Sequence, residues 1–444
     1  MVQSSNEVIK RWLSVFNKCS YNNEMLGILS FHLIFGQVVF PARIYKQGIR
    51  EDPRVNMFYM QDSGSGKTTA LDLCVYVEKK LGFNVIDNIS KLSDAYLVGS
   101  YTEGKNKKDI KKLHGKLKDI DILHVDEGEI LFKGGDYNKN LVNILNAAAN
   151  TYLSAGNKVV VGYKGSLMGG EISFYPHCSV GITTYEPEAI SKGLLRKGLF
   201  QRYFFYPRQL TIEDRILNSR IDAQNVGKKF DYRRAVEPVI SELLEIKDYV
   251  DSHGEIDISF DKVRPLLTQC IDILYNKIKH IPPEIGRVLG EFISRYNTKY
   301  YVLCLHHALL SKRFEINKDD VYYANSILMD MFEKQLNFIE GKHSTYKEIS
   351  RRYVDFSVLV KAFERTKIKD ARTARSMGVQ IGYAPKTELL RTYAELLGVS
   401  AATARKKYIE LCKTKRFSDA IVEESGFKFN RRFVKIYTLN GGGA

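Results

Sequence analysis

Hydrophobic residues follow two alternating patterns between residues 54 and 207. Short apolar runs of strand type recur between longer segments in which apolar residues return every three or four positions. The strand-like runs are 55–60, 120–125, 178–184 and 202–206, and the helix-like segments are 67–81 and 139–153. This alternation is typical of an α/β fold, in which helices connect the strands of a largely parallel sheet.

The segments on both sides of this region have a helical period. Ile9, Trp12, Leu13 and Phe16 share one helical face, so residues 1–50 predict a helical lead-in to the α/β core. We assign that core to 51–210 and a helical lid or connector to 211–342. The apolar stripes that predict the lid run through 234–249, 262–279, 286–310 and 318–339.

Residues 343–440 show a third pattern, which begins with two helices. A helical segment over 387–397 ends at Gly398, and Ser400 is placed to cap a second helix that runs to Lys413. Two helices joined by so short a turn are typical of a helix-turn-helix unit. The alternative is an ordinary helical hairpin that packs a core.

Two strand-like runs, 420–424 and 432–437, follow these helices and bracket Ser425 and Gly426, as the strands of a wing would. We therefore predict a winged helix-turn-helix domain, followed by a tail at 441–444. Basic residues on or just after the second helix are candidate DNA contacts. They include Arg405, Lys406 and Lys413.

The charge of the chain indicates what kind of partner it binds. The 444 residues carry a net charge of +16, and 44% of them are hydrophobic, which fits a globular protein that binds a polyanion. The alternative is a basic protein that is merely soluble. The charge is clustered, because one segment holds seven lysines and 391–416 is also basic, and clustering favours nucleic acid. The lysines are Lys105, Lys107, Lys108, Lys111, Lys112, Lys116 and Lys118.

Several classes of protein are disfavoured. The chain has no run of eighteen apolar residues and no basic, apolar leader, so we expect a soluble, cytoplasmic protein with no membrane partner. Its six cysteines include no C-x-x-C pair, which argues against a disulfide framework or a zinc site.

The run from Gln61 to Thr69 reads as a phosphate-binding loop between a strand and a helix. Glycine-rich backbone would turn its amides toward phosphate oxygens, Lys67 would reach the terminal phosphates, and Thr68 would ligate magnesium. Gln61 stands where the pattern has its first glycine. The alternative is a Gly/Ser turn with a solvated lysine. The candidate nucleotide-binding residues are Ser63, Gly64, Ser65, Gly66, Lys67, Thr68 and Thr69.

A second acidic motif follows about sixty residues later, where a β-prone run ends in Asp126 and Glu127. Asp126 would hold Mg²⁺ and Glu127 would polarise the attacking water, a pairing that favours ATP hydrolysis over phosphoryl transfer to a substrate. The alternative is a strand that ends in a solvated acidic turn. His124 lies inside the strand and reads as a packed core residue.

Two further positions are candidates for the same chemistry. The strand at 179–184 ends in Thr183 and Thr184, one of which would orient the water or sense the γ-phosphate. Arg202, with Arg196 as second choice, precedes an aromatic strand and would reach the γ-phosphate of a neighbouring subunit. Each of these residues has a plainly structural alternative, as a strand residue or a salt-bridged arginine.

In combination, the phosphate loop, 123–127, 182–188 and 198–204 resemble the P-loop ATPase domain of phage and plasmid primase-helicases. They are similar, more distantly, to minichromosome maintenance and superfamily 3 helicases. The resemblance covers about residues 50–340 and implies an AAA+ core that works as a ring, usually a hexamer, with ATP between subunits and Arg202 as the arginine finger.

The resemblance also gives meaning to three other features. Strands at 157–165 and 170–175 would form a hairpin that points into a central channel, where Lys164 would contact the phosphates of single-stranded DNA. Arg295 would be a second sensor arginine. Gln61, the lack of a preceding primase segment and the C-terminal winged helix depart from the family pattern. The second departure indicates that any primase or loader is a separate protein, or that the chain is not a primase-helicase.

These features together predict an ATPase that translocates on DNA, as a ring-forming replicative helicase of a phage or mobile element with ATP and Mg²⁺ as cofactors. An ATP-switched initiator or assembly protein that binds DNA without separating its strands is the alternative. A small-molecule kinase is a third possibility, and it predicts a monomer whose use of ATP ignores DNA.

Overall fold

The computed structural model divides the chain into two compact units, Met1–Lys342 and His343–Ala444. The residues that it describes are 6–40, 42–46, 49–61, 66–87, 94–103, 110–126, 128, 141–150, 159–162, 171–174, 176–185, 198–254, 256–342, 344–413, 420–425 and 432–437.

A five-stranded sheet lies at the centre of the first unit, and every neighbouring pair of its strands is parallel. The strand order is β11-β3-β10-β7-β4. The expected parallel α/β core is thus confirmed, and β4 joins it as a strand that the sequence did not predict. The strands are β3 (Met57–Gln61), β4 (Val85–Ile86), β7 (Ile122–Val125), β10 (Ser179–Thr184) and β11 (Phe204–Arg208).

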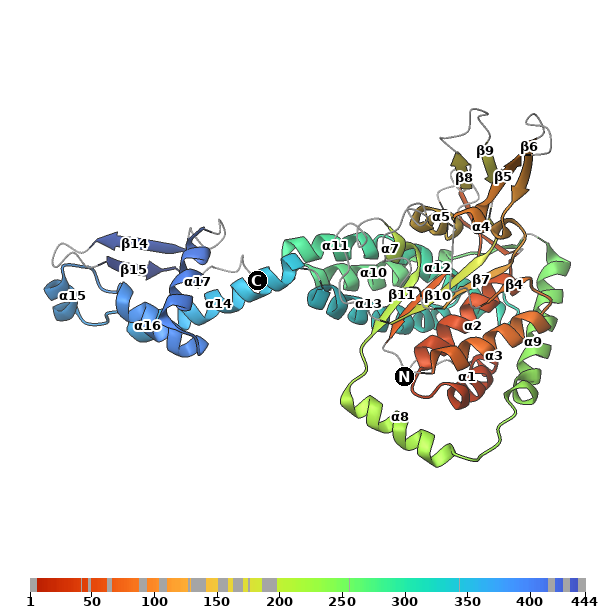
Figure 1. Ribbon diagram of the computed structural model, residues 1–444, viewed down its shortest axis with the longest axis horizontal. Helices are drawn as coiled ribbons and strands as arrows, with labels where there is room; N and C mark the ends of the chain where they lie inside the picture. Colours follow the sequence, from red (N-terminus) through yellow and green to blue (C-terminus); the bar gives the residue numbers. More distant parts are fainter. Residues whose placement is uncertain are drawn as a thin grey trace. The chain divides into compact units, whose positions relative to one another are not determined.

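Neighbouring residues of β3 point to opposite faces of this sheet, and each face is covered by aromatic contacts and helices. Tyr59 stacks on Tyr206 on one face, while Phe58 packs edge-on against Phe200 and Phe205 on the other. In Figure 1, α1 to α3 lie to one side of the sheet and α10, α11 and α13 to the other. The bounds are α1 (Glu7–Cys19), α2 (Glu24–Val38), α3 (Lys67–Lys80), α7 (Leu199–Arg202), α10 (Arg264–Ile278), α11 (Pro283–Ile293) and α13 (Lys318–Lys342).

The N-terminal helices belong to the interior of this unit. Every residue of α2 after Glu24 is buried, which is the expected position of a helix that is apolar on all sides. Trp12 on α1 is fully buried and donates a hydrogen bond to the carbonyl of Gly27. A small sheet with the order β12-β1-β2, not predicted from sequence, follows these helices. Its strands are β1 (Ala42–Lys46), β2 (Ile49–Glu51) and β12 (Ile256–Asp257).

Residues 211–342 are mainly helical, as expected. The stripe at 286–310 forms two helices, α11 and α12 (Tyr296–Leu309), with a break at Ser294 and Arg295. α9 (Tyr232–His253) corresponds to the expected helix at 234–249. α8 (Ile212–Asn225), which was not predicted, has no buried residue.

Two antiparallel hairpins, β5–β6 and β8–β9, project from the same end of the unit in Figure 1. The second is the hairpin expected before β10, although Lys164 lies outside the described residues. The first carries part of the lysine cluster, and the exposed Lys116 and Lys118 follow it in a short helical turn whose central residue, Leu117, is buried. The bounds are α4 (Asp94–Val98), β5 (Gly99–Glu103), β6 (Ile110–His114), α5 (Leu141–Ala148), β8 (Val159–Gly162) and β9 (Glu171–Phe174).

The second unit contains the two helices and two strands that the sequence predicts there. α16 ends directly before Gly398, and the Ser400 hydroxyl accepts a hydrogen bond from the Thr403 amide at 3.2 Å, at the start of α17. A three-stranded antiparallel sheet has the order β13-β15-β14. The elements are α14 (Ser344–Thr366), α15 (Ala371–Met377), β13 (Ala384–Pro385), α16 (Lys386–Leu397), α17 (Ala401–Lys413), β14 (Ile421–Ser425) and β15 (Arg432–Ile436).

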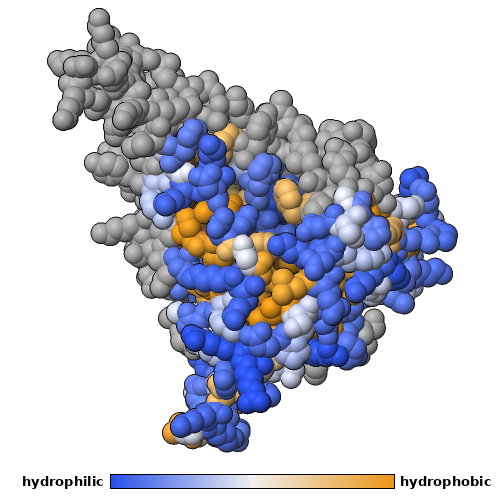
Figure 2. Space-filling view, turned by 90° about the vertical axis from the view of Figure 1, so that its right-hand side faces the viewer, coloured by the Kyte–Doolittle hydropathy of each residue, from blue (hydrophilic) through white to orange (hydrophobic). Residues whose placement is uncertain are grey.

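Hydrophilic residues cover most of the described surface on the face that Figure 2 shows, and hydrophobic residues reach the surface in the middle of it. Among the helices in the described part of the chain, none combines the length and the hydropathy that a bilayer crossing requires.

Candidate functional site

The carboxyl ends of β3, β7 and β10 meet at one edge of the central sheet, which we call the carboxyl edge. Strand pairing brings Met60 beside Thr184 and Val125 beside Ile182. In an open parallel sheet, this edge is where ligands bind, because the loops that follow the strands converge there. Several candidates from the sequence therefore lie close together.

Lys67 is the first residue of α3 and lies at this edge. Its Nζ atom donates a hydrogen bond to the carbonyl of Gln61, the last residue of β3, at 2.8 Å. Gly66, directly before the helix, has a φ of +76°, a left-handed conformation that glycine adopts readily. The lysine amine and the N-terminus of α3 thus lie together beyond the end of β3, while Ser63, Gly64 and Ser65 are outside the described residues.

The two carboxylate oxygens of Asp126, which directly follows β7, contact a residue of strand β10 and a residue of helix α3. The Thr183 hydroxyl donates a hydrogen bond to Asp126 Oδ1 at 2.8 Å, and the Thr68 hydroxyl lies 3.5 Å from Asp126 Oδ2. Thr184, the neighbour of Thr183 in β10, instead donates to the carbonyl of Tyr185. Of the two threonines considered, the structure brings Thr183 to Asp126. Glu127 lies outside the described residues.

These oxygens fit a magnesium ion that also binds phosphate. Mg²⁺ prefers oxygen ligands and usually keeps several waters, so one hydroxyl and one carboxylate from the protein are enough beside a nucleotide. Thr68 and Asp126 supply these two groups. The described residues include no cluster of three His, Cys, Asp or Glu side chains that would hold a metal ion without a substrate.

His124 is a packed residue of β7, as the sequence indicates, and it has a buried acidic partner. Its Nε2 atom lies 2.9 Å from both carboxylate oxygens of Glu78 on α3, and both side chains are almost fully buried. A Cβ atom at Gly181 would lie 2.9 Å from Nδ1 of His124, so glycine makes room for the ring. Sequence analysis missed Glu78, which joins α3 to the sheet.

A pocket with about 370 Å³ of free space lies beside Gly66 and Thr69. Tyr21, Phe230 and Tyr232 contribute aromatic rings to its lining, and Asn218 on α8 contributes an amide. Its size falls within the range of ligand pockets, and Lys18, Lys228 and Asp222 add charged groups to the lining. The start of α3 is therefore next to a space that can hold a ring system. Thr69 itself is exposed.

Arg202 and Arg295 lie at the opposite edge of the sheet, which we call the amino edge. In the parallel pair of β11 and β3, Phe204 stands opposite Met57, so Arg202 lies before the start of both strands. Strand β3 alone spans about 13 Å at about 3.3 Å per residue. Arg202 is therefore remote from Lys67 of the same chain.

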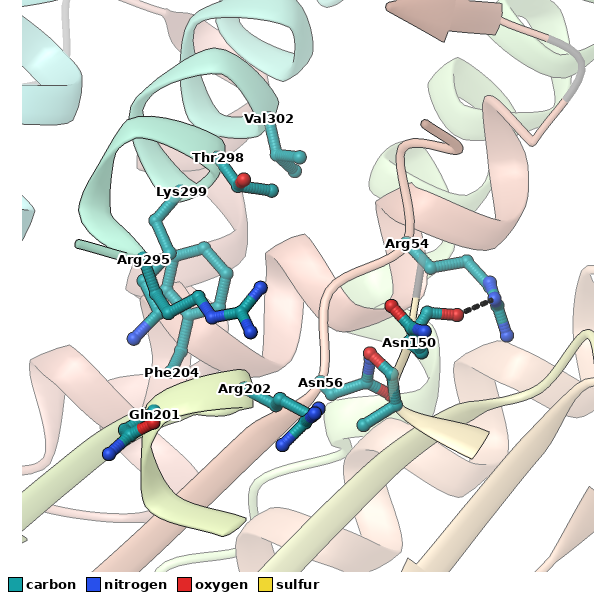
Figure 3. A pocket seen from close by; sticks show the side chains of 11 residues that line it. Arg54, Asn56, Asn150, Gln201, Arg202, Phe204, Arg295, Thr298, Lys299 and Val302 are labelled. Carbon is teal, nitrogen blue, oxygen red and sulfur yellow. Dashed lines mark hydrogen bonds between the residues drawn. The ribbon is translucent and has the colours of Figure 1, made fainter. Parts of the chain in front are cut away.

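Figure 3 shows Arg202 and Arg295 at a common pocket, with Lys299 on the same helix as Arg295. Burial and the nearby Arg295 charge lower the pKa of Arg202. Arg295 thus lies with Arg202 and not beside Lys67. Arg196 is outside the described residues.

The wall of this pocket opposite α12 (Figure 3) is built by buried polar groups that the sequence did not reveal. Arg54 is paired with Asp52 at 2.8 Å, and it donates hydrogen bonds to the carbonyls of Cys178 at 2.8 Å and Asn150 at 3.1 Å. Asn56 accepts a hydrogen bond from the Val180 amide at 2.8 Å. These bonds link the residues just before β3 to the start of β10.

The candidate nucleic-acid contacts of the second unit lie on α17. Arg405, Lys406 and Lys413 are all exposed, and none forms an ion pair with a residue of the described chain. Lys407, on the same helix, is instead bound to Asp355 of α14 at 2.6 Å. The helix therefore packs through Lys407 and presents its other basic residues to solvent.

A scan against protein-family models found no match for this chain, and a search of curated proteins found no matching sequence.

Proposed function

We propose that this protein is a P-loop ATPase of the AAA+ type that couples ATP hydrolysis to movement on DNA, as a ring-forming helicase of a phage or mobile element. The observation that carries the proposal is the meeting of Lys67, Thr68, Asp126 and Thr183 at the carboxyl edge. An amine and a hydroxyl at the start of a helix, with a carboxylate beside them, are groups that a magnesium-bound triphosphate requires.

Each residue of this group has a role in the proposal. Lys67 binds the terminal phosphates, and Thr68 and Asp126 hold Mg²⁺. Bound Mg²⁺ would neutralise the charge that develops on the transferred phosphoryl group. Thr183 holds the Asp126 carboxylate in place through its hydrogen bond. Glu127, which follows Asp126 in the chain, is the candidate base for the attacking water.

The nucleoside would occupy the pocket beside Gly66 and Thr69. Its aromatic lining favours a stacked base, and its volume of about 370 Å³ is sufficient for one. The distance between the two edges of the sheet supports a ring. Because Arg202 lies at the amino edge, it meets an ATP phosphate only when that ATP is bound to another copy of the chain.

DNA is the second ligand in this proposal. The pattern of two helices followed by a two-stranded hairpin supports a winged helix, with α17 as the helix that contacts duplex DNA. The exposed Arg405, Lys406 and Lys413 are suited to phosphate contacts. The hairpin β8–β9 and the lysines around β5–β6 are the candidates for contacts with a single strand.

ATP turnover and strand displacement test the proposal together. We expect the purified protein to hydrolyse ATP faster when single-stranded DNA is added, and to release the annealed strand of a forked duplex. Lys67→Ala should abolish both activities, whereas Lys10→Ala, which removes an exposed lysine on α1, should change neither.

Each contrary result has a distinct meaning. DNA-stimulated hydrolysis without strand release would support an ATP-switched initiator or assembly protein in place of a helicase. Turnover that ignores DNA would favour a small-molecule kinase. Equal activity of Lys67→Ala and Lys10→Ala would remove the nucleotide from the carboxyl edge altogether.

The contribution of α17 is tested by salt dependence. Replacing Arg405, Lys406 and Lys413 with alanine should weaken duplex binding and lower the slope of log affinity against log salt by about 3, since each phosphate contact contributes about 0.9. A control with the same charge change replaces three exposed basic residues along and after α14, Lys361, Arg365 and Lys369. If the two triple variants lose affinity equally, α17 is not the DNA-binding helix.

A further inference from the structure

The face of α17 that is turned away from the core has an isoleucine at its centre. Ala404, Tyr408 and Leu411 form the buried face of this helix and belong to the hydrophobic core of the second unit. At about 100° per residue, Ile409 lies about 130° around the helix axis from the middle of that face. Its side chain is 43% exposed, so Ile409 contributes little to the core.

Positive charge lies on both sides of this isoleucine. Arg405 and Lys406 precede Ile409 by four and three residues, and Lys413 follows it by four. Side chains three or four residues apart are neighbours on a helix surface, and all three of these basic residues are exposed. Glu410, the only acid of α17, lies about 100° around the axis from Ile409. The exposed face thus combines an apolar centre with basic residues around it.

These two features together limit what can cover the face. A single exposed apolar residue is common on protein surfaces and implies no partner by itself. Here the isoleucine is surrounded by cations, so a partner must offer an apolar group and negative charge in the same place. The major groove of duplex DNA does so, because phosphates border it and the C5-methyl group of thymine lies on its floor. The groove is also wide enough to admit a helix.

We propose that α17 reads thymine in the major groove of duplex DNA. Ile409 contacts the C5-methyl group of the base, and Arg405, Lys406 and Lys413 contact the phosphates on either side. Thymine recognition rests on the DNA contact of α17 proposed above, and it adds a preference for base sequence to that contact. Phosphate contacts alone carry no direct sequence information.

The first turn of α17 favours a close approach to the bases. Ala401 and Ala402 are exposed and have short side chains. The Thr403 hydroxyl lies 2.9 Å from that of Ser400, so it is engaged at the start of the helix. Recognition helices contact base edges with their N-terminal residues. With no long side chain in this turn, the helix can lie deep enough for Ile409 to reach a methyl group in the groove.

Selection from a pool of duplexes with a random central segment tests the proposal. The full-length chain is used without ATP and at one fixed salt concentration, because phosphate contacts depend on salt. We expect the bound fraction to be enriched in a sequence that contains thymine. Replacing that thymine with deoxyuridine removes only the methyl group and keeps the base pair. This replacement should weaken binding by roughly threefold or more, the effect of one buried methyl group.

Two variants show whether Ile409 is responsible. Ile409→Ala should bind the thymine and deoxyuridine duplexes equally, with the affinity that the unmodified chain has for the deoxyuridine duplex. Ile381→Ala is the matched control, since Ile381 is 54% exposed in the same unit and lies outside α17. It should keep the full difference between the two duplexes.

The proposal is wrong if no sequence is enriched, if the enriched sequence has no thymine, or if Ile409→Ala prefers thymine as strongly as Ile381→Ala does. Duplex binding that survives without any base preference leaves the phosphate contacts of α17 in place, whereas a chain that binds no duplex overturns both proposals. If Ile409→Ala keeps the thymine preference but weakens self-association in sedimentation, Ile409 belongs instead to a contact between copies of the chain.

Discussion

The two edges of the parallel sheet carry opposite kinds of chemistry. At the carboxyl edge, Lys67 is bonded to a backbone carbonyl and Asp126 holds two hydroxyls, so each charged group has polar partners. At the amino edge, Arg295 and Lys299 have no acidic partner in the described protein, and the Lys299 amine makes no hydrogen bond. One edge has balanced charges, and the other has an excess of positive charge.

This difference indicates how the edges would work together. A magnesium-bound phosphate needs both an acid for the metal and cations for its oxygens. The carboxyl edge has the acid, and most of the cations lie more than a strand length away. In one chain the two edges cannot meet at a single phosphate, so in the proposed ring the amino edge of one copy would meet the carboxyl edge of the next.

Removing the acid should have the largest effect. Asp126→Asn should lower ATP turnover by about 100-fold or more. The substitution weakens metal binding and removes the negative charge that contacts Thr68 and Thr183. Steady-state ATPase assays with the full chain measure this. Asp119→Asn is the matched control, since Asp119 is an exposed acid just before β7, near the amino edge. Equal activity in both variants would contradict the assignment of Asp126.

The sequence predicts the elements whose buried residues form a clear apolar pattern. It does not predict the elements that lack such a pattern. Strands β3, β7, β10 and β11 are buried apolar runs, and the sequence predicts all of them. β4 has only two residues, too few to show a period. α8 has no buried residue, and its apolar residues Ile212, Ile216 and Leu217 are exposed, so they do not form the narrow core-facing stripe that reveals other helices.

The same reasoning explains which site residues were found. Lys67 and Asp126 belong to local motifs, so spacing alone identifies them. The choice between Thr183 and Thr184 depends on which face of β10 meets Asp126, and a strand alternates its faces at every residue. Lys299 has no motif, although Arg295 and Lys299 are like charges four residues apart on one helix, a spacing that is normally unfavourable.

Low pH should destabilise the protein by disrupting the buried hydrogen bonds of His306 and His32, which lie near the amino edge. His306 donates from Nε2 to the carbonyl of Pro53 at 2.8 Å, accepts from Nδ1 of His32 at 2.9 Å, and His32 accepts from the Tyr323 hydroxyl at 2.8 Å. This pattern requires neutral rings. Burial lowers the pKa of His306 to about 3 and that of His32 well below its usual value.

The direction in which stability changes with pH depends on how many protons the folded and unfolded states bind. Between pH 6.5 and about 3, the unfolded chain binds more protons at His306 than the folded chain does, so stability falls as pH falls. At pH 5 we expect a loss of about 2 kcal/mol from His306 alone. Urea unfolding followed by fluorescence of Trp12, the only tryptophan, reports on the first unit. His306→Gln should reduce the loss, and His280→Gln, at an exposed histidine, should not.

Lys299→Met should stabilise the amino edge, by at least about 1 kcal/mol at pH 7, because it removes a buried amine without a hydrogen-bond partner. The pKa of Lys299 is lowered to about 7, so the unfolded chain binds more protons from pH 7 to about 10.5 and the unmodified protein gains stability as pH rises. The advantage of Lys299→Met should therefore shrink above pH 7. The other ionisable groups around this amine are Arg202, Arg295, Tyr296 and the paired Arg54 and Asp52. Lower stability of the variant at every pH would mean that the lysine is structurally required.

The smallest effect should come from Gln61 at the carboxyl edge. Like Lys299, Gln61 is a buried polar residue without a hydrogen-bond partner, but it is uncharged. Its side chain is fully buried, and neither its amide nitrogen nor its oxygen has a hydrogen-bond partner in the described protein. Gln61→Met keeps the volume and removes the two polar atoms, so we expect a gain of about 1 kcal/mol in the free energy of unfolding. Gln37 is the matched control, because its buried amide donates to the carbonyls of Asp121 at 2.7 Å and His177 at 3.0 Å. Gln37→Met should therefore destabilise the protein. In urea unfolding, the free energy of unfolding should rise for Gln61→Met and fall for Gln37→Met. A smaller rise for Gln61→Met than for Lys299→Met would show that the buried group without a partner at the amino edge costs more, because it is charged.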